Sequence, residues 1–274
     1  MGGIATHSID SLVGDLARLG VQAGDTVMVH ASLRAIGPVE AGALGLIEAL
    51  DRAVGPTGTL MMTLGADDPW SWVNKRPEHE RLAALVDATP FDSATTPADP
   101  DVGMLAEVFR TAPGTRVNDH PEGRFGARGA RAAALVDDPP WNDYYGPGSP
   151  LERFVAAGGK VLRLGADLDT VTLLHWAEYR ADVPDTRRVT RHRRIRTADG
   201  GSEVRTISCL DDSGGIAEQP ADEDYFATIT RLAISEGTPQ GWVHVDRVGD
   251  ATCELLDGAR LVAFGADWMN RHLV

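Results

Sequence analysis

The chain has 274 residues, a length that suits one large domain with enough buried surface for a stable core. Its 40 acidic and 26 basic residues give a net charge of −14, which argues against a nucleic-acid partner because phosphate binding needs a basic face. An acidic cleft would instead attract cations, but the same charge also suits a protein that is simply kept in solution.

Other features of the composition bear on where the protein works. No apolar run approaches the roughly 20 residues that a membrane helix needs, so no membrane partner is expected. The first ten residues, MGGIATHSID, lack the basic and apolar parts of a signal peptide, which predicts a cytoplasmic protein. Because the cytoplasm keeps thiols reduced, we expect Cys209 and Cys253 to be two free thiols. No HxxxH or CxxC spacing occurs, so no metal is predicted.

The first 64 residues predict a helix followed by a strand–helix–strand unit. An amphipathic helix covers residues 8–20, with Ser8 or Asp10 as its cap and Gly20 as its end. The elements that follow are a buried strand at Thr26–His30, a helix at 42–54 closed by the turn sequence GPTG, and a second strand at Thr59–Leu64. This order predicts a parallel unit with a right-handed crossover.

Residues 65–102 differ from the rest of the chain. They are rich in Asp, Pro and Trp and predict a long surface excursion with one helix at about 78–87. Loops of this length in compact domains usually serve as lids or binding loops. We therefore expect a single domain over 1–274 that carries a lid-like excursion at 65–102.

The remaining pattern alternates helices and strands. Helices are expected at 103–113, 127–136, 149–159 and 170–180, a strand at Lys160–Gly165, and an antiparallel hairpin at 187–210 around the turn at 199–201. A helix, a short strand at 260–265 (RLVAFG) and a C-terminal helix complete the chain. The whole predicts an α/β fold with a mixed central sheet, helices on both faces and an antiparallel section.

The strongest local signal for chemistry is the segment VLRLGADLDTVTLLHWAEYR at 161–180. His175 and Glu178 are three residues apart on one helix face, just after the carboxyl end of a strand, where ligands bind in open α/β sheets. A carboxylate beside an imidazole orients the ring as a general base requires. The same spacing also suits a surface histidine beside a solvated glutamate, and spacing alone does not decide between them.

A second signal is the segment VMVHASLRAIG at 27–37. His30 ends the first buried strand, and the chain then bends through Ser32, Leu33 and Arg34 to Gly37. Backbone N–H groups at such a bend can hold a pyrophosphate or a pantetheine amide. Walker and GxGxxG patterns are absent. His30 itself suits a core histidine with its hydrogen bonds satisfied, and a ligand role stays open.

Five blocks of the chain resemble the aminoglycoside 3-N-acetyltransferase family. They occur in the same order as in the family, and the similarity covers nearly the whole chain. They are VHASLRAIGPVEAGALGLIEALDRAVGPTGTLMM, GMLAEVFRTAPGTRVNDHP, YGPGSPLERFVAAGGKVLRLGADLDTVTLLHWAE, DDSGGI and LVAFGADWM. The resemblance implies a fold distinct from that of the GNAT acetyltransferases, acetyl-CoA as co-substrate, and transfer of its acetyl group to the 3-amino group of an aminoglycoside antibiotic, which confers resistance. We expect the protein to be a monomer or a homodimer.

The resemblance also implies roles for particular residues. The family's catalytic histidine corresponds to His175, with Glu178 as its acidic partner. Acetyl-CoA binding corresponds to Ser32, Leu33, Arg34, Gly37, Gly103 and Met104. Acids that line the family's aminoglycoside pocket correspond to Asp67 or Asp68 and to Asp212. The chain departs from the family at Asn118, where relatives carry serine, and at Leu210, where several relatives carry an acid.

The mechanism implied is direct transfer in a ternary complex, with His175 as general base and Glu178 or Asp212 orienting its ring. Two alternatives remain at this point. One is an acetyltransferase of the same fold that acts on an amine other than an antibiotic. The other is a non-catalytic protein that sequesters polycationic aminoglycosides.

Overall fold

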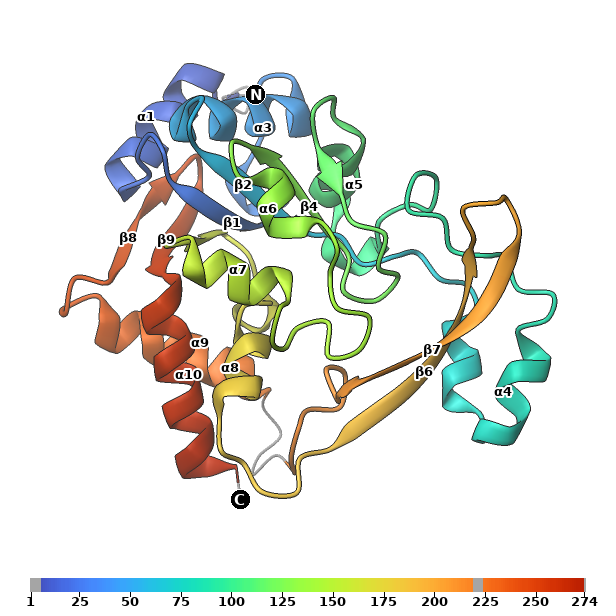
Figure 1. The fold of residues 1–274 in the computed structure, drawn as a ribbon. Helices are drawn as coiled ribbons and strands as arrows, with labels where there is room; N and C mark the ends of the chain where they lie inside the picture. Colours follow the sequence, from blue (N-terminus) through green and yellow to red (C-terminus); the bar gives the residue numbers. More distant parts are fainter. Residues whose placement is uncertain (1–5, 219–223, 274) are drawn as a thin grey trace, which may run out of the picture.

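A seven-stranded mixed sheet forms the centre of the computed structural model, which describes residues 6–218 and 224–273 (Figure 1). In spatial order its strands are β3 (Arg116–Val117), β4 (Phe125–Gly129), β2 (Thr59–Thr63), β1 (Thr26–Ala31), β5 (Lys160–Leu164), β9 (Ala251–Asp257) and β8 (Val243–Val248). The three central strands β2, β1 and β5 are parallel, and every other pairing is antiparallel. The predicted parallel β1–helix–β2 unit is therefore confirmed.

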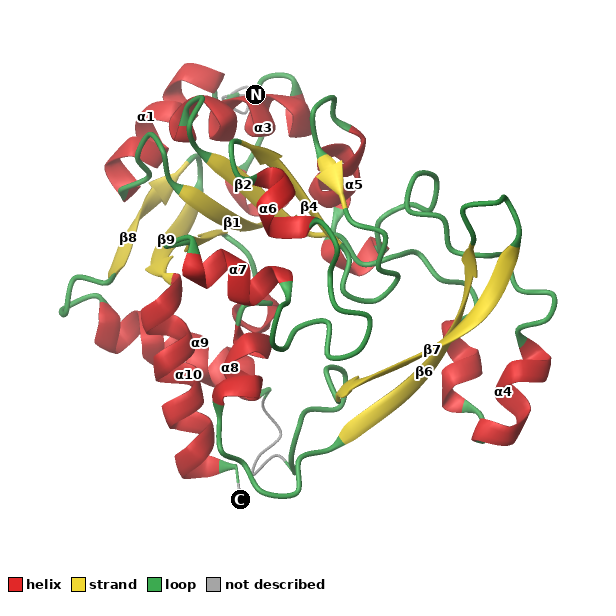
Figure 2. Cartoon of the chain, in the orientation of Figure 1, coloured by secondary structure: helices red, strands yellow, loops and turns green. Residues whose placement is uncertain are grey.

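Helices cover both faces of the sheet (Figure 2). The helices are α1 (Ile9–Leu19), α2 (Leu33–Ile36), α3 (Gly42–Val54), α4 (Glu78–Ala84), α5 (Met104–Thr111), α6 (Ala132–Val136), α7 (Pro150–Ala156), α8 (Leu174–Arg180), α9 (Tyr225–Gly237) and α10 (Gly258–His272). Three short 3-10 helices lie at η1 (Ser71–Lys75), η2 (Pro100–Val102) and η3 (Leu168–Thr170).

The alternation of side chains along each strand creates two separate cores. Val27 and Val29 of β1 pack with α1, α3 and α5 on one face. Met28 points to the other face and packs with α6 to α10. Both cores consist of side chains that are almost fully buried, so each face of the sheet holds its own layer of helices. The expected mixed α/β fold with helices on both faces is confirmed.

The ends of the helices follow from capping chemistry. The Ser8 hydroxyl accepts a hydrogen bond from the backbone N–H of Ser11, and Gly20 ends α1 in the left-handed region at φ 108°. Ser149 accepts from the N–H of Glu152, and Pro150 follows as the first residue of α7. These caps explain why the starts of the two helices were predicted to within one residue.

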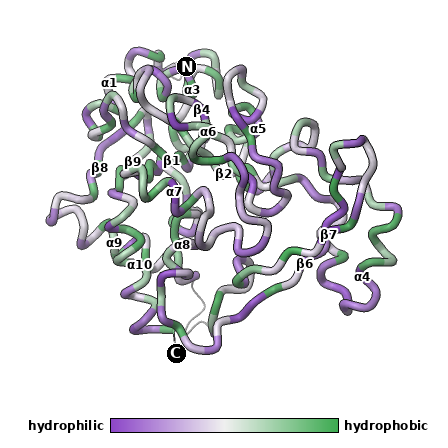
Figure 3. Tube along the Cα trace, in the orientation of Figure 1, coloured by the Kyte–Doolittle hydropathy of each residue, from purple (hydrophilic) through white to green (hydrophobic). Residues whose placement is uncertain are grey.

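A two-stranded antiparallel hairpin, β6 (Arg188–Arg196) and β7 (Ser202–Leu210), projects away from the central sheet (Figure 1). The segment 65–102, with η1, α4 and η2, lies against it: Asn74 hydrogen-bonds the backbone of His192, and the Phe91 N–H donates to the carbonyl of Arg194. Most of β6 is hydrophilic, whereas β1 and β2 are hydrophobic (Figure 3). The hairpin was predicted, including its turn at 199–201.

Two of the predicted elements, the helix at 127–136 and the strand at 260–265, are wrong. The helix expected at 127–136 begins only at Ala132, because Phe125–Gly129 pairs with β2 as strand β4. The strand expected at 260–265 lies inside α10, where buried residues recur at helical spacing and the Asp257 carboxylate caps the first turn. A short apolar run does not distinguish the two kinds of element. Strands β8 and β9 were not predicted, because β8 is mostly exposed and polar.

Two expectations from composition can be compared with the structure. Cys209 and Cys253 are both buried free thiols, as expected. Within residues 6–218 and 224–273, no helix has the length and apolar character needed to span a bilayer.

Candidate active site

A cavity of about 740 Å³ opens at the carboxyl ends of the parallel strands β2, β1 and β5. The loop after β1, the start of α5, the loop after β5 and the start of α8 complete its wall. We call it the strand-end cavity, and its lining includes His30, Ser32, Thr63 and His175. Its position is the one in which open α/β sheets usually bind ligands.

Five of the six residues expected to bind acetyl-CoA line the strand-end cavity: Ser32, Leu33, Arg34, Gly103 and Met104. The Ser32 hydroxyl accepts from the N–H of Ala35 and so starts α2 at the cavity wall. Gly103 precedes α5 with φ 87°, a conformation that favours glycine.

Gly37 is the exception, because it lines none of the cavities that the described residues form around the strand ends. It ends α2 with φ 89°, and a Cβ atom placed there would lie 2.4 Å from the Asp250 carboxylate. The structure therefore places Gly37 in a turn beside the cavity, where it shapes the chain that carries Ser32.

His175 lies in the first turn of α8 and forms a hydrogen-bonded chain with two buried groups. Its Nδ1 atom is 2.8 Å from Oε2 of Glu178, whose side chain is 1% exposed. The Tyr225 hydroxyl donates to the other oxygen of that carboxylate. With both oxygens engaged, the Glu178 carboxylate holds the imidazole through Nδ1 and leaves Nε2 as the atom that can exchange a proton.

Two aromatic side chains fix the plane of the His175 ring. Tyr145 stacks on it at 4.7 Å between ring centroids and 6° between planes, and Phe226 meets it edge-on at 4.8 Å. Tyr145 also lines the neighbouring cavity described next. The ring therefore has one orientation, as a group that transfers protons needs.

The surroundings of His175 raise its pKa above the ordinary value for histidine. Burial alone lowers this pKa, but the charge and hydrogen bond of Glu178 outweigh burial, and Asp212 and Asp224 add to the increase. The imidazole is therefore a stronger base than a histidine in water.

A second cavity, of about 870 Å³, lies between segment 65–102 and strand β6, and we call it the hairpin cavity. It adjoins the strand-end cavity, because Thr63, Asp101 and Val102 line both. Its acids are Asp67, Asp68, Glu78, Asp99, Asp101 and Glu122. Two bound molecules could thus meet near the ends of β1 and β2.

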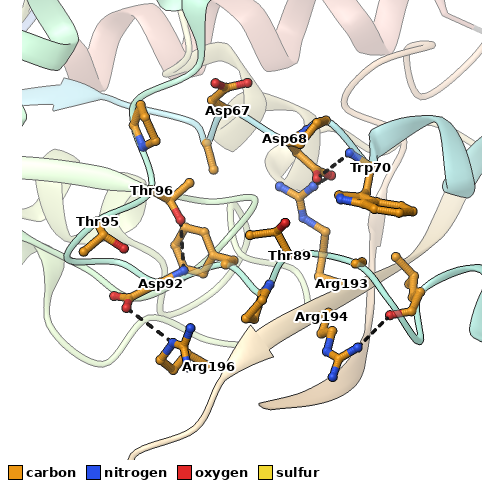
Figure 4. Close-up of a pocket in the computed structure, with 17 residues that line it drawn as sticks. Asp67, Asp68, Trp70, Thr89, Asp92, Thr95, Thr96, Arg193, Arg194 and Arg196 are labelled. Atoms are coloured by element: carbon orange, nitrogen blue, oxygen red, sulfur yellow. Dashed lines mark hydrogen bonds and ion pairs between the residues drawn. The ribbon is translucent and has the colours of Figure 1, made fainter. Parts of the chain in front are cut away.

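The acids expected to line a substrate pocket do not have equal surroundings. The Asp68 carboxylate forms an ion pair with Arg193 and accepts from the N–H of Trp70 at 2.9 Å, whereas Asp67 in the same view has no such partner (Figure 4). Asp212 binds Arg191 and accepts from the Tyr144 hydroxyl.

Glu122 joins these two ion pairs. Its Oε1 is 2.9 Å from Nε of Arg193, and its Oε2 is 4.0 Å from Nε of Arg191. Burial raises the pKa of Glu122 to about 7, helped by Asp212 and Asp99 and opposed by Arg191. Arg191, Glu122, Arg193 and Asp68 therefore alternate in charge along one side of the hairpin cavity, and Asp212, which lines the strand-end cavity, extends this series beyond Arg191. Among the described residues, Asp67, Glu78, Asp99 and Asp101 form no ion pair, and they supply the cavity's free negative charge.

Comparison with known proteins agrees with the geometry. The family model of aminoglycoside 3-N-acetyltransferases matches residues 28–270. Aminoglycoside N(3)-acetyltransferase III of Serratia marcescens is 39% identical, and the alignment covers 97% of this chain and 98% of that protein. The chain belongs to the aminoglycoside 3-N-acetyltransferase family. It is therefore an acetyltransferase.

Two solved structures of the family show what their own proteins bind. A structure of AAC-IIIb in binary complex with CoASH has a TM-score of 0.89 and 36% identity, and the match covers 98% of this chain and 99% of that chain. AAC-VIa bound to sisomicin has a TM-score of 0.87 and 36% identity, with 98% and 100% covered. Both likenesses extend over the whole acetyltransferase, in keeping with the expected fold distinct from that of GNAT enzymes.

Asn118 holds a turn beside the site in this acetyltransferase. Its buried amide donates to the carbonyl of Gly123 at 3.1 Å and accepts from the N–H of Phe125 at 3.3 Å. His120, in the same turn, accepts from the N–H groups of Glu122 and Gly123 through Nδ1, so its Nε2 donates to the carbonyl of Trp141. Together the two side chains hold the turn that places Glu122.

Several residues of the site were missed by the sequence reasoning. Tyr145, Tyr225 and Phe226 surround His175 and Glu178. Arg191 and Arg193 form ion pairs with Asp212 and Asp68, and Glu122 contacts both arginines. A tyrosine directly before a glycine-rich turn, or an arginine in a basic strand, carries no local signal for such a contact. The one available hint was the basic block 187–196, in which Arg188, Arg191 and Arg193 line the hairpin cavity together with its acids.

Proposed function

We propose that this acetyltransferase moves the acetyl group of acetyl-CoA to the 3-amino group of aminoglycoside antibiotics in the cytoplasm, and thereby confers resistance. The observation that carries the proposal is the hydrogen-bonded chain from Tyr225 through Glu178 to His175, which opens on a cavity at the strand ends. The family relatives support the choice of substrates, because their structures hold CoASH and sisomicin.

The two adjoining cavities suit the two substrates. Acetyl-CoA occupies the strand-end cavity, where Ser32, Leu33, Arg34, Gly103 and Met104 line the wall. The aminoglycoside occupies the hairpin cavity, whose free carboxylates match a polycation. Segment 65–102 acts as the lid-like wall of this site. Binding both molecules side by side permits direct transfer without an acetyl-enzyme.

His175 acts as the general base. An amine attacks a thioester only through its free lone pair, so a proton must leave the nitrogen before or during attack. His175 takes that proton at Nε2 while Glu178 stabilises the charge that develops on the ring. Glu178 is buried and bound by Tyr225, so it can serve this purpose without moving. General-base assistance of this kind contributes about 10²–10⁴ to a rate.

Asp67, Asp68 and Asp212 are proposed to face the aminoglycoside, but in different ways. Asp67 has no ion-pair partner among the described residues and can bind an ammonium group directly. Asp68 and Asp212 already hold Arg193 and Arg191, so their charge is shared between the protein and the substrate. Asp212 also lines the strand-end cavity with His175, which places it near the reacting amine.

The test is release of CoA thiol from acetyl-CoA with a panel of aminoglycosides, using wild type, His175→Ala and the control His244→Ala. His244 is exposed on the edge strand β8, which β9 separates from β5, and it does not line the strand-end cavity. We expect His175→Ala to lower turnover by at least about 10²-fold with nearly unchanged acetyl-CoA affinity, and His244→Ala to match wild type.

Two results would contradict the proposal. If His175→Ala keeps a turnover like that of wild type, His175 is not the base. If wild type acetylates no aminoglycoside but accepts another amine, the fold serves a different substrate.

A further inference from the structure

A second histidine, His30, shares the strand-end cavity with His175. It lies near the end of β1, and its register partner in β5 is Arg163. Because side chains alternate along a strand, His30 is on the same face of the sheet as Met28, which packs in the core that contains α8. His30 and His175 therefore approach the cavity from the sheet and from the helix that covers it.

His30 is not the satisfied core histidine that its position in a buried strand suggests. The residue is only 9% exposed, and its Nε2 atom is buried without a hydrogen-bond partner within the described part of the chain. Buried polar atoms nearly always have a partner, since leaving one without costs about 1–3 kcal/mol. Because His30 also lines the strand-end cavity, an atom of a bound ligand can supply the partner that this ring nitrogen lacks.

The two histidines have opposite electrostatic surroundings. Burial, with a smaller contribution from Arg163, lowers the pKa of His30 to about 4, whereas the acids around His175 raise the pKa of that residue. His30 is therefore neutral and too weak a base to remove a proton from an amine. A neutral imidazole can still donate one N–H, and two titratable groups with pKa values pushed apart are typical of a division of roles.

We infer that His30 donates a hydrogen bond from Nε2–H to the carbonyl oxygen of the acetyl thioester and stabilises the oxyanion that forms there. The inference rests on the proposed acetyl transfer and adds a catalytic residue to it. It also assigns different tasks to the two histidines: His175 handles the proton of the amine, and His30 stabilises the charge on oxygen.

The step is balanced as follows. The amine lone pair forms a C–N bond to the acetyl carbon, and the π electrons of the carbonyl move to its oxygen, which His30 stabilises. His175 takes one proton from the nitrogen. When the C=O bond re-forms, the C–S bond breaks with its electron pair on sulfur, and His175 returns the proton to that sulfur. The products are the N-acetylated amine and CoA thiol.

The first test compares His30→Met with His30→Gln. Methionine fills the space without a donor, and the glutamine amide carries an N–H near the position of Nε2. We expect His30→Met to lower kcat by about 10²–10³-fold, the usual effect of losing an oxyanion donor, with acetyl-CoA affinity within about threefold of wild type. We expect His30→Gln to keep kcat within about tenfold.

Each other outcome overturns the inference. Wild-type kcat in His30→Met, or equal loss in both variants, means that a donor at this position does not matter. Weaker acetyl-CoA binding with unchanged kcat means that His30 only holds the cofactor. These results differ from failure of the proposed function, in which wild type itself would release no thiol with any aminoglycoside.

A second measurement uses the wild-type protein and does not depend on how the variants fold. Nitrogen-15 NMR of the histidine rings should show His30 neutral, with the proton on Nε2, from pH 5.5 to 8. Its Nε2–H signal should shift on saturation with acetyl-CoA and not with CoA thiol, which lacks the carbonyl. Equal shifts with both, or a proton on Nδ1 alone, would overturn the inference.

Discussion

Replacing Glu178 by glutamine tests how the surroundings of His175 set its basicity. Glutamine has nearly the same shape, and its carbonyl can still accept from Nδ1–H of His175 while its amide donates to the Tyr225 hydroxyl. The hydrogen-bonded chain thus survives, and what is removed is the charge. Since Glu178 is almost fully buried and bound on both sides, the change should leave the fold intact.

The magnitude follows from the hydrogen bond that loses its charge. Hydrogen bonds to charged groups contribute about 1.5–3 kcal/mol and neutral ones about 0.5–1.5 kcal/mol, so the loss is about 1–1.5 kcal/mol. Because the charge on Glu178 favours the protonated imidazole, its loss should lower the pKa of His175. The sign is fixed because burial, which lowers this pKa, stays, while the main group that raises it loses its charge.

A general base must be deprotonated, so kcat/KM rises with pH through the pKa of His175. In Glu178→Gln this acidic limb should therefore move to lower pH, and the plateau should fall because a weaker base accepts the proton less readily. Asp212, Asp224 and Asp169 also face the ring and remain in the variant.

The assay is loss of thioester absorbance from pH 5 to 9 with one aminoglycoside for both proteins. The substrate amine titrates identically in each, so the difference between the profiles reports the enzyme. Glu236→Gln, an exposed residue of α9, is the matched control and should superimpose on wild type. An acidic limb that stays in place, or moves to higher pH, would refute the argument that Glu178 sets the basicity of His175.

Three further predictions concern the hairpin cavity and the ligand proposed to bind there. Asp67→Asn should raise KM by about 10–100-fold for aminoglycosides with an ammonium group there, and less for those with a hydroxyl, as a kcat/KM panel would show; a uniform change for all drugs would contradict a direct contact. Asp68→Asn should instead leave Arg193 partly unpaired and destabilise the fold by up to about 3 kcal/mol, measured by urea unfolding, and an unchanged midpoint would contradict this. Aminoglycoside binding should weaken with salt much more than acetyl-CoA binding, because exposed charges are screened over about 8–10 Å; calorimetric titrations with equal salt slopes would show that the net charge serves solubility alone.

The sequence predicted the fold best where a local rule decides the structure. Ser8 and Ser149 are helix caps by type, and the hairpin turn at 199–201 needs its Asp–Gly–Gly sequence. The sequence-based prediction was wrong where tertiary contacts determine the structure. Strand β4 forms because it pairs with β2 through backbone hydrogen bonds. The apolar run at 260–265 is helical because it belongs to α10, which packs on α8 and α9.

As with the fold, the sequence predicted those contacts of the site that depend on local geometry and missed those that depend on tertiary packing. His175 and Glu178 are three residues apart on a helix, so their contact follows from helical geometry. Tyr225 reaches Glu178 from 47 residues away, and Asp212 meets Tyr144 across 68 residues. Contacts of that kind depend on how α9 and the hairpin return to the sheet. No local pattern contains that information, and the same is true of the unsatisfied nitrogen of His30.

The arginines of β6 change how the net charge of −14 should be understood. Arg191 and Arg193 neutralise Asp212 and Asp68, so acids that sequence resemblance assigns to a polycation are already paired. An ammonium group that binds Asp68 competes with a guanidinium held at fixed geometry, and gains less than it would from a free carboxylate. Selectivity among aminoglycosides should therefore depend chiefly on Asp67 and the other unpaired acids across the cavity. The paired ones act by keeping Glu122 and β6 in place beside the substrate.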